Sequence, residues 1–330
     1  MNIVILYGQP IENAGKDEQD TLVQVDVISQ ALSRLGIQSV AVPLSLDLQE
    51  AIQTLRWICP DLVFNLVESV AGQGRLIHLA PALLDMLKIP YTGAKTEAIF
   101  LTSNKLLAKN FLQSSNLPTP QWFSSDNLEA SVSLTPGTYI LKSVWEHASV
   151  GISEDSVIQA ETVSEMHQAL THYLDRLGGE GFIESYIDGR EFNLSLLAGD
   201  GKVEVLPPAE ICFDVYPEGK LKIVDYHAKW VEDSFEYHNT PRRFEFSKQD
   251  EPLLECLKIL AKTCWHLFGL RGYARVDFRV DQRGEPWILE INANPCLSPD
   301  AGFMAAANQA GSSFDQVVER IIHYSYSATQ

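Results

Sequence analysis

The sequence lacks the cysteine pattern of a disulfide framework or a zinc site. Its five cysteines are odd in number and widely spaced, and no two of them form a Cys-x-x-Cys pair. The eight histidines show no metal-ligand spacing either. These absences predict a protein of a reducing compartment, and we expect it in the cytoplasm.

Long apolar runs and dense positive charge are also missing. No window reaches the ~18 consecutive apolar residues needed to span a membrane, and the apolar start of the chain has no basic flank or cleavage site. With 43 acidic against 25 basic residues, the formal charge is −18. This balance argues against nucleic acid or an anionic membrane as the main partner. The 330 residues are 45% hydrophobic, which predicts a globular chain of two or three domains.

Residues 1–102 have the pattern of a doubly wound α/β unit. Apolar runs predict strands over 3–7, 38–42 and 61–66, and helical spacing predicts a helix over 20–35. Because helix and strand alternate, we expect a parallel sheet. Gly8, Gln9 and Pro10 end the first strand at the edge where ligands of such sheets bind.

After residue 102 the pattern changes to α+β. A helix beginning near Ser103, a strand at 139–142, a helix over 162–177 and a strand at 181–187 predict a small domain over 103–188, about the size of a lid. The remainder, 189–330, is expected to form a larger third domain. Its predicted elements are strands 191–198 and 202–206, an irregular polar segment over 225–245, and helices 252–268 and 313–325.

The most informative segment is a predicted hairpin over 275–294, with a turn at 281–284. Apolar residues at every second position of its first strand place Arg275, Asp277 and Arg279 on one face. In the second strand, Trp287 and Leu289 occupy the apolar positions.

If Val280 pairs with Glu285, Arg275 lies near Glu290 and Asp277 lies near Ile288. Asp277, Glu290 and Asn292 then become neighbours on one surface. Oxygen ligands of this kind suit a hard divalent cation shared with nucleotide phosphates. The alternative is the solvated face of an ordinary surface hairpin.

Three lysines on separate elements add a phosphate-binding hypothesis. Lys142 ends an apolar strand, Lys105 opens a helix where a cation opposes the helix dipole, and Lys229 lies in the long polar segment. Each alone is explained equally well as a solvated surface lysine. Together with the acidic hairpin they fit a polyphosphate and its metal.

A nucleoside site is predicted where two strands meet. Glu184 and Glu191 flank residues 185–187, whose backbone could bind an adenine edge while a carboxylate holds ribose hydroxyls. No Ser-His-Asp or Cys-His arrangement has local support, and Cys296 is interpreted as a packed thiol rather than a nucleophile.

Eight segments in this order are similar to those of a known family. They are Ile-Pro-Tyr-Thr-Gly at 89–93, Ser-Asn-Lys at 103–105, Ile-Leu-Lys at 140–142, Ser-Val-Gly at 149–151, Phe-Ile-Glu-Ser-Tyr-Ile with Gly-Arg-Glu-Phe at 182–192, Tyr-His-Ala-Lys at 226–229, Arg-Val-Asp-Phe at 275–278 and Leu-Glu-Ile-Asn-Ala-Asn-Pro at 289–295. Through them the whole chain resembles ATP-grasp ligases, most closely the D-alanine–D-alanine ligase branch. The resemblance implies an ATP-grasp fold preceded by the doubly wound domain.

The resemblance also implies roles for individual residues. ATP phosphates would be bound by Lys105, Lys142 and Lys229, the nucleoside by Glu184, Ser185, Tyr186, Ile187 and Glu191, and magnesium, with manganese as an alternative, by Asp277, Glu290 and Asn292. The catalytic residues would be Arg275, Ser149 and Lys229, with Arg275 stabilising the oxyanion of a tetrahedral intermediate. The implied reaction joins a carboxylate to an amine, both from amino acids, through an acyl phosphate. The family also suggests a homodimer.

Departures from the family pattern leave the substrates open. A serine that grips the acceptor carboxylate aligns with Ala301, a glycine before it with Cys296, and a tyrosine with Trp230. The N-terminal box is replaced by residues 15–21, where Glu18 or Asp20 could bind an amino group, and the glycine-rich phosphate loop has become Trp-Glu-His-Ala at 145–148. The alternatives are a ligase for other carboxylates and amines, and a noncatalytic ATP-binding sensor.

Overall fold

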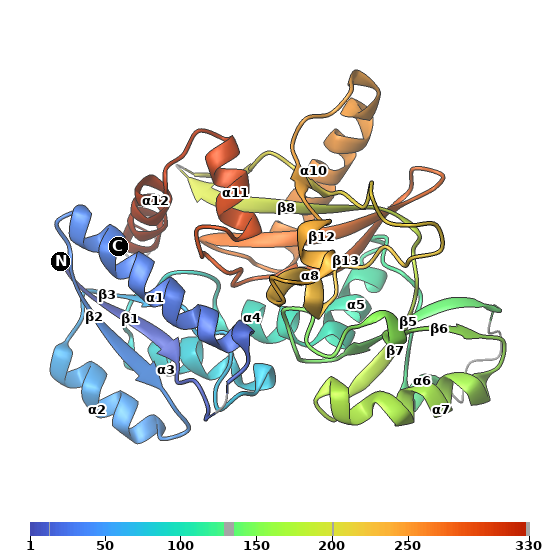
Figure 1. Ribbon diagram of the computed structural model, residues 1–330. Helices are drawn as coiled ribbons and strands as arrows, with labels where there is room; N and C mark the ends of the chain where they lie inside the picture. Colours follow the sequence, from blue (N-terminus) through green and yellow to red (C-terminus); the bar gives the residue numbers. More distant parts are fainter. Residues whose placement is uncertain (13, 129–134, 200, 328–330) are drawn as a thin grey trace.

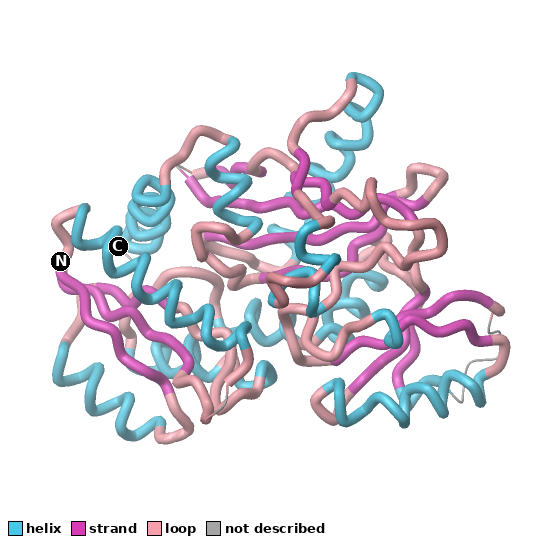
Figure 2. The backbone as a smooth tube through the Cα atoms, in the orientation of Figure 1, coloured by secondary structure: helices cyan, strands magenta, loops and turns pink. Residues whose placement is uncertain are grey.

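The computed structural model describes residues 1–12, 14–128, 135–199 and 201–327. Three sheets follow one another along the chain, each with its own helices (Figure 1). Figure 2 shows the strands of the third and largest sheet crossing the upper half of the molecule, between the other two sheets. Within the described residues, no helix is long and apolar enough to cross a membrane.

The first sheet is parallel, as predicted, and its strand order is β2-β1-β3. Alternate residues of β1 enter two different cores: Ile3 and Ile5 pack with α1, and Val4 and Leu6 pack with α2 and α3. Helices therefore cover both faces, which is the doubly wound arrangement. The elements are β1 (Asn2–Gly8), α1 (Lys16–Arg34), β2 (Gln38–Leu44), α2 (Leu48–Ile58), β3 (Leu62–Asn65) and α3 (Leu79–Leu87).

The second sheet is antiparallel, in the order β4-β7-β5-β6, with α7 packed against it. Two helices, α4 (Thr96–Ser103) and α5 (Lys105–Ser114), lead into it, and the predicted strands at 139–142 and 181–187 are found as β5 and β7. The elements are β4 (Trp122–Ser124), α6 (Ser125–Leu128), β5 (Gly137–Ser143), β6 (Val157–Ala160), α7 (Val163–Tyr173) and β7 (Gly181–Ser185).

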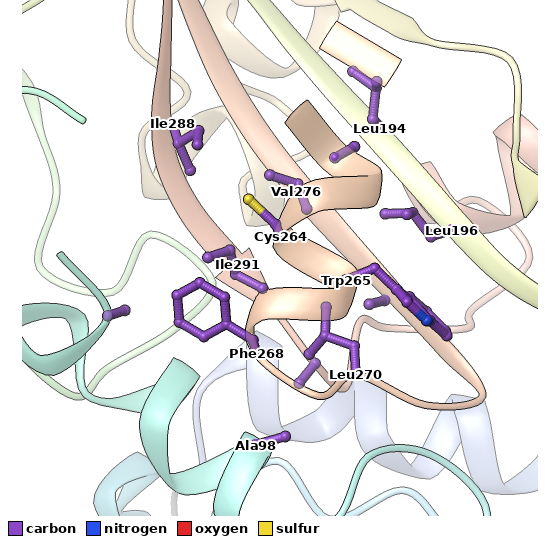
Figure 3. Close-up of a cluster of buried hydrophobic side chains, with 14 of the residues drawn as sticks. Ala98, Leu194, Leu196, Cys264, Trp265, Phe268, Leu270, Val276, Ile288 and Ile291 are labelled. Atoms are coloured by element: carbon purple, nitrogen blue, oxygen red, sulfur yellow. The ribbon is translucent and has the colours of Figure 1, made fainter. Parts of the chain in front are cut away.

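The third sheet has six strands, in the order β11-β10-β8-β12-β13 with β9 paired to β8. One face packs on α10, where Trp265 and Phe268 meet Leu196, Val276 and Ile291 (Figure 3). The elements are β8 (Gly189–Gly199), β9 (Lys202–Val205), β10 (Ala209–Ile211), α8 (Tyr226–Trp230), α9 (Phe235–His238), β11 (Arg242–Arg243), α10 (Glu251–Leu267), β12 (Tyr273–Asp281), β13 (Pro286–Asn292), α11 (Gly302–Gln309) and α12 (Phe314–Ser327).

The register predicted for the hairpin of β12 and β13 was wrong. Asp277 pairs with Glu290 and Phe278 with Ile288, so Leu289 is an extra residue in a β-bulge. Because of the bulge, Leu289 lies on the same side as Glu290, whereas the prediction placed it on the apolar side. Ile288 and Ile291 enter the core instead. Simple alternation cannot reveal such an insertion.

The prediction of an irregular segment over 225–245 was also wrong. The segment contains α8, α9 and β11. Asp225 accepts a hydrogen bond from the backbone N–H of Ala228, and Ser234 accepts one from that of Tyr237. These side chains cap the two short helices, and an Asp or Ser directly before each helical turn was the available signal.

The C-terminal helices return to the first sheet. Val317 and Ile321 of α12 share a core with Ile28 and Leu32 of α1, and Arg34 donates two hydrogen bonds to Asp315, of 2.8 and 2.6 Å. Apolar contacts therefore join the beginning and end of the chain. The division into units 1–102, 103–188 and 189–330 is retained as a proposal.

Gly189 gives a test of the close contact between β8 and β12 in the third sheet. A Cβ added there would lie 1.9 Å from the backbone oxygen of Val280, so we expect Gly189→Ala to lower the free energy of unfolding by at least ~1–3 kcal/mol. Gly137→Ala is the matched control, because its nearest atom, the oxygen of Thr135, is 3.9 Å away. Urea unfolding measures both variants, and equal midpoints would contradict the predicted clash.

Candidate active site

A pocket between the second and third sheets brings together most residues predicted for the site. Its lining includes Lys105, Lys142, Ser149, Glu184, Ser185, Tyr186, Ile187, Glu191, Lys229, Asp277 and Glu290. Arg275 and Asn292 are not part of the lining. Lys105 and Glu290 are 185 positions apart in the sequence, yet both face this one pocket. The hairpin is therefore not an ordinary solvated surface hairpin.

Asp277 forms the floor of the pocket at its acidic end. Arg275 donates two hydrogen bonds to its carboxylate, of 2.7 and 2.9 Å, and the side-chain amide of Asn193 donates a third, of 2.9 Å. Burial raises the pKa of Asp277, and the neighbouring charge of Glu290 adds to that rise. Arg275 therefore acts on the pocket indirectly, by holding the carboxylate of Asp277 in place.

Glu290 lies opposite Asp277 and is surrounded by positive charge. Burial alone would raise its pKa, but the charges of Lys105, Lys229 and Arg275 outweigh burial and hold the pKa well below its ordinary value. Two facing carboxylates are a donor set that fits a hard divalent cation. The predicted third ligand, Asn292, pairs with Arg275 in the sheet, and its side-chain oxygen accepts a hydrogen bond from the N–H of Asn294, of 3.0 Å.

The lysines enter the pocket from three elements. Lys105, in the first turn of α5, donates to the backbone oxygen of Glu146 at 2.6 Å, and Lys142 at the end of β5 donates to Glu184 at 2.7 Å. Burial lowers the pKa of both Lys105 and Lys229, and the charge of Glu290 opposes this shift. The positive charges of Lys105 and Lys229 are thus concentrated around the carboxylate of Glu290.

A strained loop closes the pocket beside the lysines. Ala148 and Ser149 have φ values of 57° and 62°, a conformation that normally favours glycine. Two contacts from the connector after β10 hold the loop: Trp230 donates to the oxygen of Ala148 at 3.0 Å, and Ser149 donates to that of Val224 at 2.8 Å. The loop over 145–151 is therefore held in part by Trp230.

The other end of the pocket presents backbone groups. The N–H of Ser185 donates to the oxygen of Gln121 at 2.8 Å, and that of Tyr186 to the oxygen of Thr138 at 3.0 Å. Among the described residues, the N–H of Ile187 has no acceptor. Glu191 lies nearby and forms an ion pair of 2.9 Å with Arg279.

A second cavity, of about 330 Å³, adjoins the pocket and shares Glu146, His147 and Val150 with it. Carboxylates dominate its lining: Asp17, Glu18, Glu68, Glu146 and Asp175. Burial raises the pKa of Glu68 to about 7, against the effect of a hydrogen bond from Gln24 and with a further rise caused by Asp20. This cavity has an excess of negative charge.

Asp20 and Cys296 lie behind the second cavity. Asp20 accepts hydrogen bonds from the hydroxyl of Ser298, at 2.8 Å, and from the thiol of Cys296, at 3.0 Å. Burial raises the pKa of that thiol well above its ordinary value, as do the charges of Glu68 and Asp20. Cys296 is therefore a protonated, packed thiol, as the sequence suggested.

Sequence reasoning missed two charged residues near the site. Lys109 is 1% exposed and pairs with Glu184. Its signal was its place four residues after Lys105 on the apolar face of the same helix, among Ala108 and Leu112. Glu68 follows the apolar run of β3 directly, at the edge where ligands of parallel sheets bind, and that position was its signal.

Comparisons with known proteins place this geometry in a family. The family profile described as "D-ala D-ala ligase C-terminus" matches residues 120–323. The chain is 30% identical to the uncharacterized protein y4sG of Sinorhizobium fredii, over 79% of this chain and 73% of that one. It is 26% identical to a D-alanine–D-alanine ligase of Moorella thermoacetica, over 98% of both chains.

Solved structures agree on the fold. The D-alanine–D-alanine ligase of Bacillus anthracis complexed with ATP superposes with a TM-score of 0.72 at 19% identity, covering 100% of this chain and 98% of that one. The D-alanyl-alanine synthetase A of Vibrio cholerae gives a TM-score of 0.75 at 17% identity, covering 99% and 98%. The ATP-grasp fold expected from the sequence is thereby confirmed. This chain belongs to the D-alanine–D-alanine ligase family of ATP-dependent ligases.

Proposed function

We propose that the protein joins a carboxylate to an amine through an acyl phosphate, converting ATP to ADP and phosphate. The observation that carries the proposal is the pocket itself. Three lysines and the carboxylates of Asp277 and Glu290 line it, and at its other end the N–H of Ile187 has no acceptor among the described residues. A nucleoside triphosphate has the matching chemistry, with a polyanion at one end and a base edge at the other.

The nucleoside end would bind adenine through the backbone. The N–H of Ile187 has no acceptor in the described part of the chain and would donate to a ring nitrogen, whereas those of Ser185 and Tyr186 are already used inside the protein. Glu191 would accept hydrogen bonds from the ribose hydroxyls, and its ion pair with Arg279 holds the carboxylate in place.

Asp277 and Glu290, with Asn292, would hold magnesium or manganese. A divalent cation supplies charge neutralisation for the transferred phosphoryl group. Lys105, Lys142 and Lys229 add positive charge around the phosphates, and Ser149 lies on the strained loop beside them.

In the reaction, an oxygen of the donor carboxylate attacks the γ-phosphorus, and ADP leaves. The amine then attacks the carbonyl carbon of the acyl phosphate, phosphate leaves, and the amine loses a proton as the amide forms. Arg275 would stabilise the oxyanion of this second step, and removing one preorganised donor typically lowers the rate ~10²–10³-fold. Because water hydrolyses acyl phosphates, the loop over 145–151 and the connector over 225–243 would exclude it.

The second cavity is the proposed amine site. Glu68 lines it, Asp20 lies behind it, and a cationic ammonium group would offset the repulsion between its carboxylates. D-alanine is the first candidate substrate because named relatives are D-alanine–D-alanine ligases. At the acceptor position, however, Ala301 begins α11 without a side-chain hydrogen bond, so another amino acid is the competing candidate.

The test is ADP release by purified protein with ATP and magnesium, across a panel of amino acids and other carboxylate–amine pairs, with products identified by mass. We expect ADP only when a carboxylate and an amine are both present. D-alanyl-D-alanine as the product would establish that specificity, and another amide would identify a different one. ATP binding without ADP release from any pair would favour the sensor alternative.

Glu290→Gln tests the proposed metal site. It removes one of two facing carboxylates, and we expect ADP release to fall by about 10²-fold or more, since metal assistance supplies several kcal/mol. Glu285→Gln is the control, because Glu285 is exposed in the turn of the same hairpin. Full activity of Glu290→Gln, in protein whose circular dichroism is unchanged, would refute the metal assignment.

Glu68 predicts a pH dependence of amine binding. Its pKa of about 7 means that the carboxyl is mostly neutral at pH 6 and mostly ionised at pH 8. The electrostatic attraction of Glu68 for a cationic amine is therefore present above pH 7 and lost below it. We expect KM for the amine to fall about tenfold from pH 6 to pH 8, following the ionised fraction.

Steady-state kinetics at the two pH values check this prediction. Glu68→Gln should remove the pH dependence of KM for the amine, whereas Glu50→Gln, at an exposed position on α2, should retain it. If KM for the amine still depends on pH in Glu68→Gln, a group other than Glu68 causes that dependence.

A further inference from the structure

Lys109 is a buried cation with no surface in the nucleotide pocket. It lies on α5, is 1% exposed, and forms an ion pair with one carboxylate oxygen of Glu184. The other oxygen of Glu184 accepts the 2.7 Å hydrogen bond from Lys142. Glu184 thus stands between a lysine that lines the pocket and a lysine that does not.

The ammonium group of Lys109 is anchored on its far side. It donates to the hydroxyl of Thr119 at 3.0 Å, and that hydroxyl donates to the backbone oxygen of Ile288 at 2.9 Å. The N–H of Ile288 donates in turn to the oxygen of Pro118 at 2.8 Å. Because Ile288 is next to the bulge that carries Glu290, Lys109 is held between the second sheet and the acidic hairpin.

Glu184 is ionised in this arrangement. Burial alone would raise its pKa, but the charges of Lys109 and Lys142 outweigh burial and hold the pKa below its ordinary value. A buried carboxylate without a counter-ion is strongly destabilising. At least one lysine must therefore remain with Glu184 at all times.

Lys142 has a second role, because its side chain is 15% exposed and lines the pocket where the phosphates are proposed to bind. If it were the only counter-ion of Glu184, its charge would have to serve a buried carboxylate and a phosphate together. We propose that Lys109 is a positioning residue that keeps Glu184 paired, so that Lys142 is free to bind phosphate. This inference rests on the proposed function, in which the pocket binds ATP.

The first variant to measure is Lys109→Met, which keeps the length of the side chain and removes the charge. By isothermal titration calorimetry at pH 8 with magnesium, we expect its ATP affinity to fall about tenfold, within the usual range for coupled buried charges. Adenosine has no phosphate, so its affinity should stay unchanged. A general disturbance of the pocket would weaken both ligands equally.

The decisive comparison repeats the substitution in a Glu184→Gln background. Glutamine carries no charge, so Lys142 no longer has to stay with it, and Lys109→Met should then change ATP affinity less than about threefold. Lys262→Met, at an exposed position on α10, is the control and should have no effect in either background. If Lys109→Met does not fold, Lys109→Gln gives the same comparison, because it retains hydrogen bonding and lacks the charge.

Three results would overturn the inference although the unmodified protein binds ATP. They are unchanged ATP affinity in Lys109→Met, an equal loss in the Glu184→Gln background, and an equal loss of adenosine affinity. Failure of the unmodified protein to bind ATP would instead overturn the proposed function, and this inference with it.

Discussion

The compensation of buried charge is the constraint on which the site depends. Asp277 and Glu290 face each other across the hairpin, and the positive charges of Lys105, Lys229 and Arg275 keep Glu290 ionised. Removing a single partner from such a group leaves an uncompensated charge, which typically costs several kcal/mol. The charges of these side chains therefore hold α5, the connector and the hairpin in one arrangement.

The sequence predicted the parts of the site that depend on local pattern. Alternation in β12 placed Arg275 and Asp277 on one face, and the order of the eight motifs identified the family before the fold was known. It could not predict the bulge at Leu289, because an inserted residue leaves no periodic trace. Lys109 was missed for a different reason: its place on the apolar face of α5 indicates burial, but the sequence does not reveal its partner Glu184, 75 residues away.

The residues that depart from the expected family pattern lie in two places, at the loop beside the pocket and beside the second cavity. Trp230 contacts the backbone of Ala148, and Cys296 contacts Asp20 beside the second cavity. The lysines and carboxylates expected to bind ATP and magnesium line one pocket. We propose that this pocket carries the nucleotide chemistry and that the second cavity selects the amine, so relatives can differ in substrate while sharing one mechanism.

The most direct test of the proposed acyl phosphate is to trace an oxygen atom of the donor carboxylate. The donor carboxylate is labelled with ¹⁸O and turned over with ATP, magnesium and the amine, and the released phosphate is analysed by mass spectrometry. An acyl phosphate requires one carboxylate oxygen to leave with the phosphate. We therefore expect labelled phosphate in proportion to the amide formed. Amide formation with unlabelled phosphate would contradict the proposed mechanism.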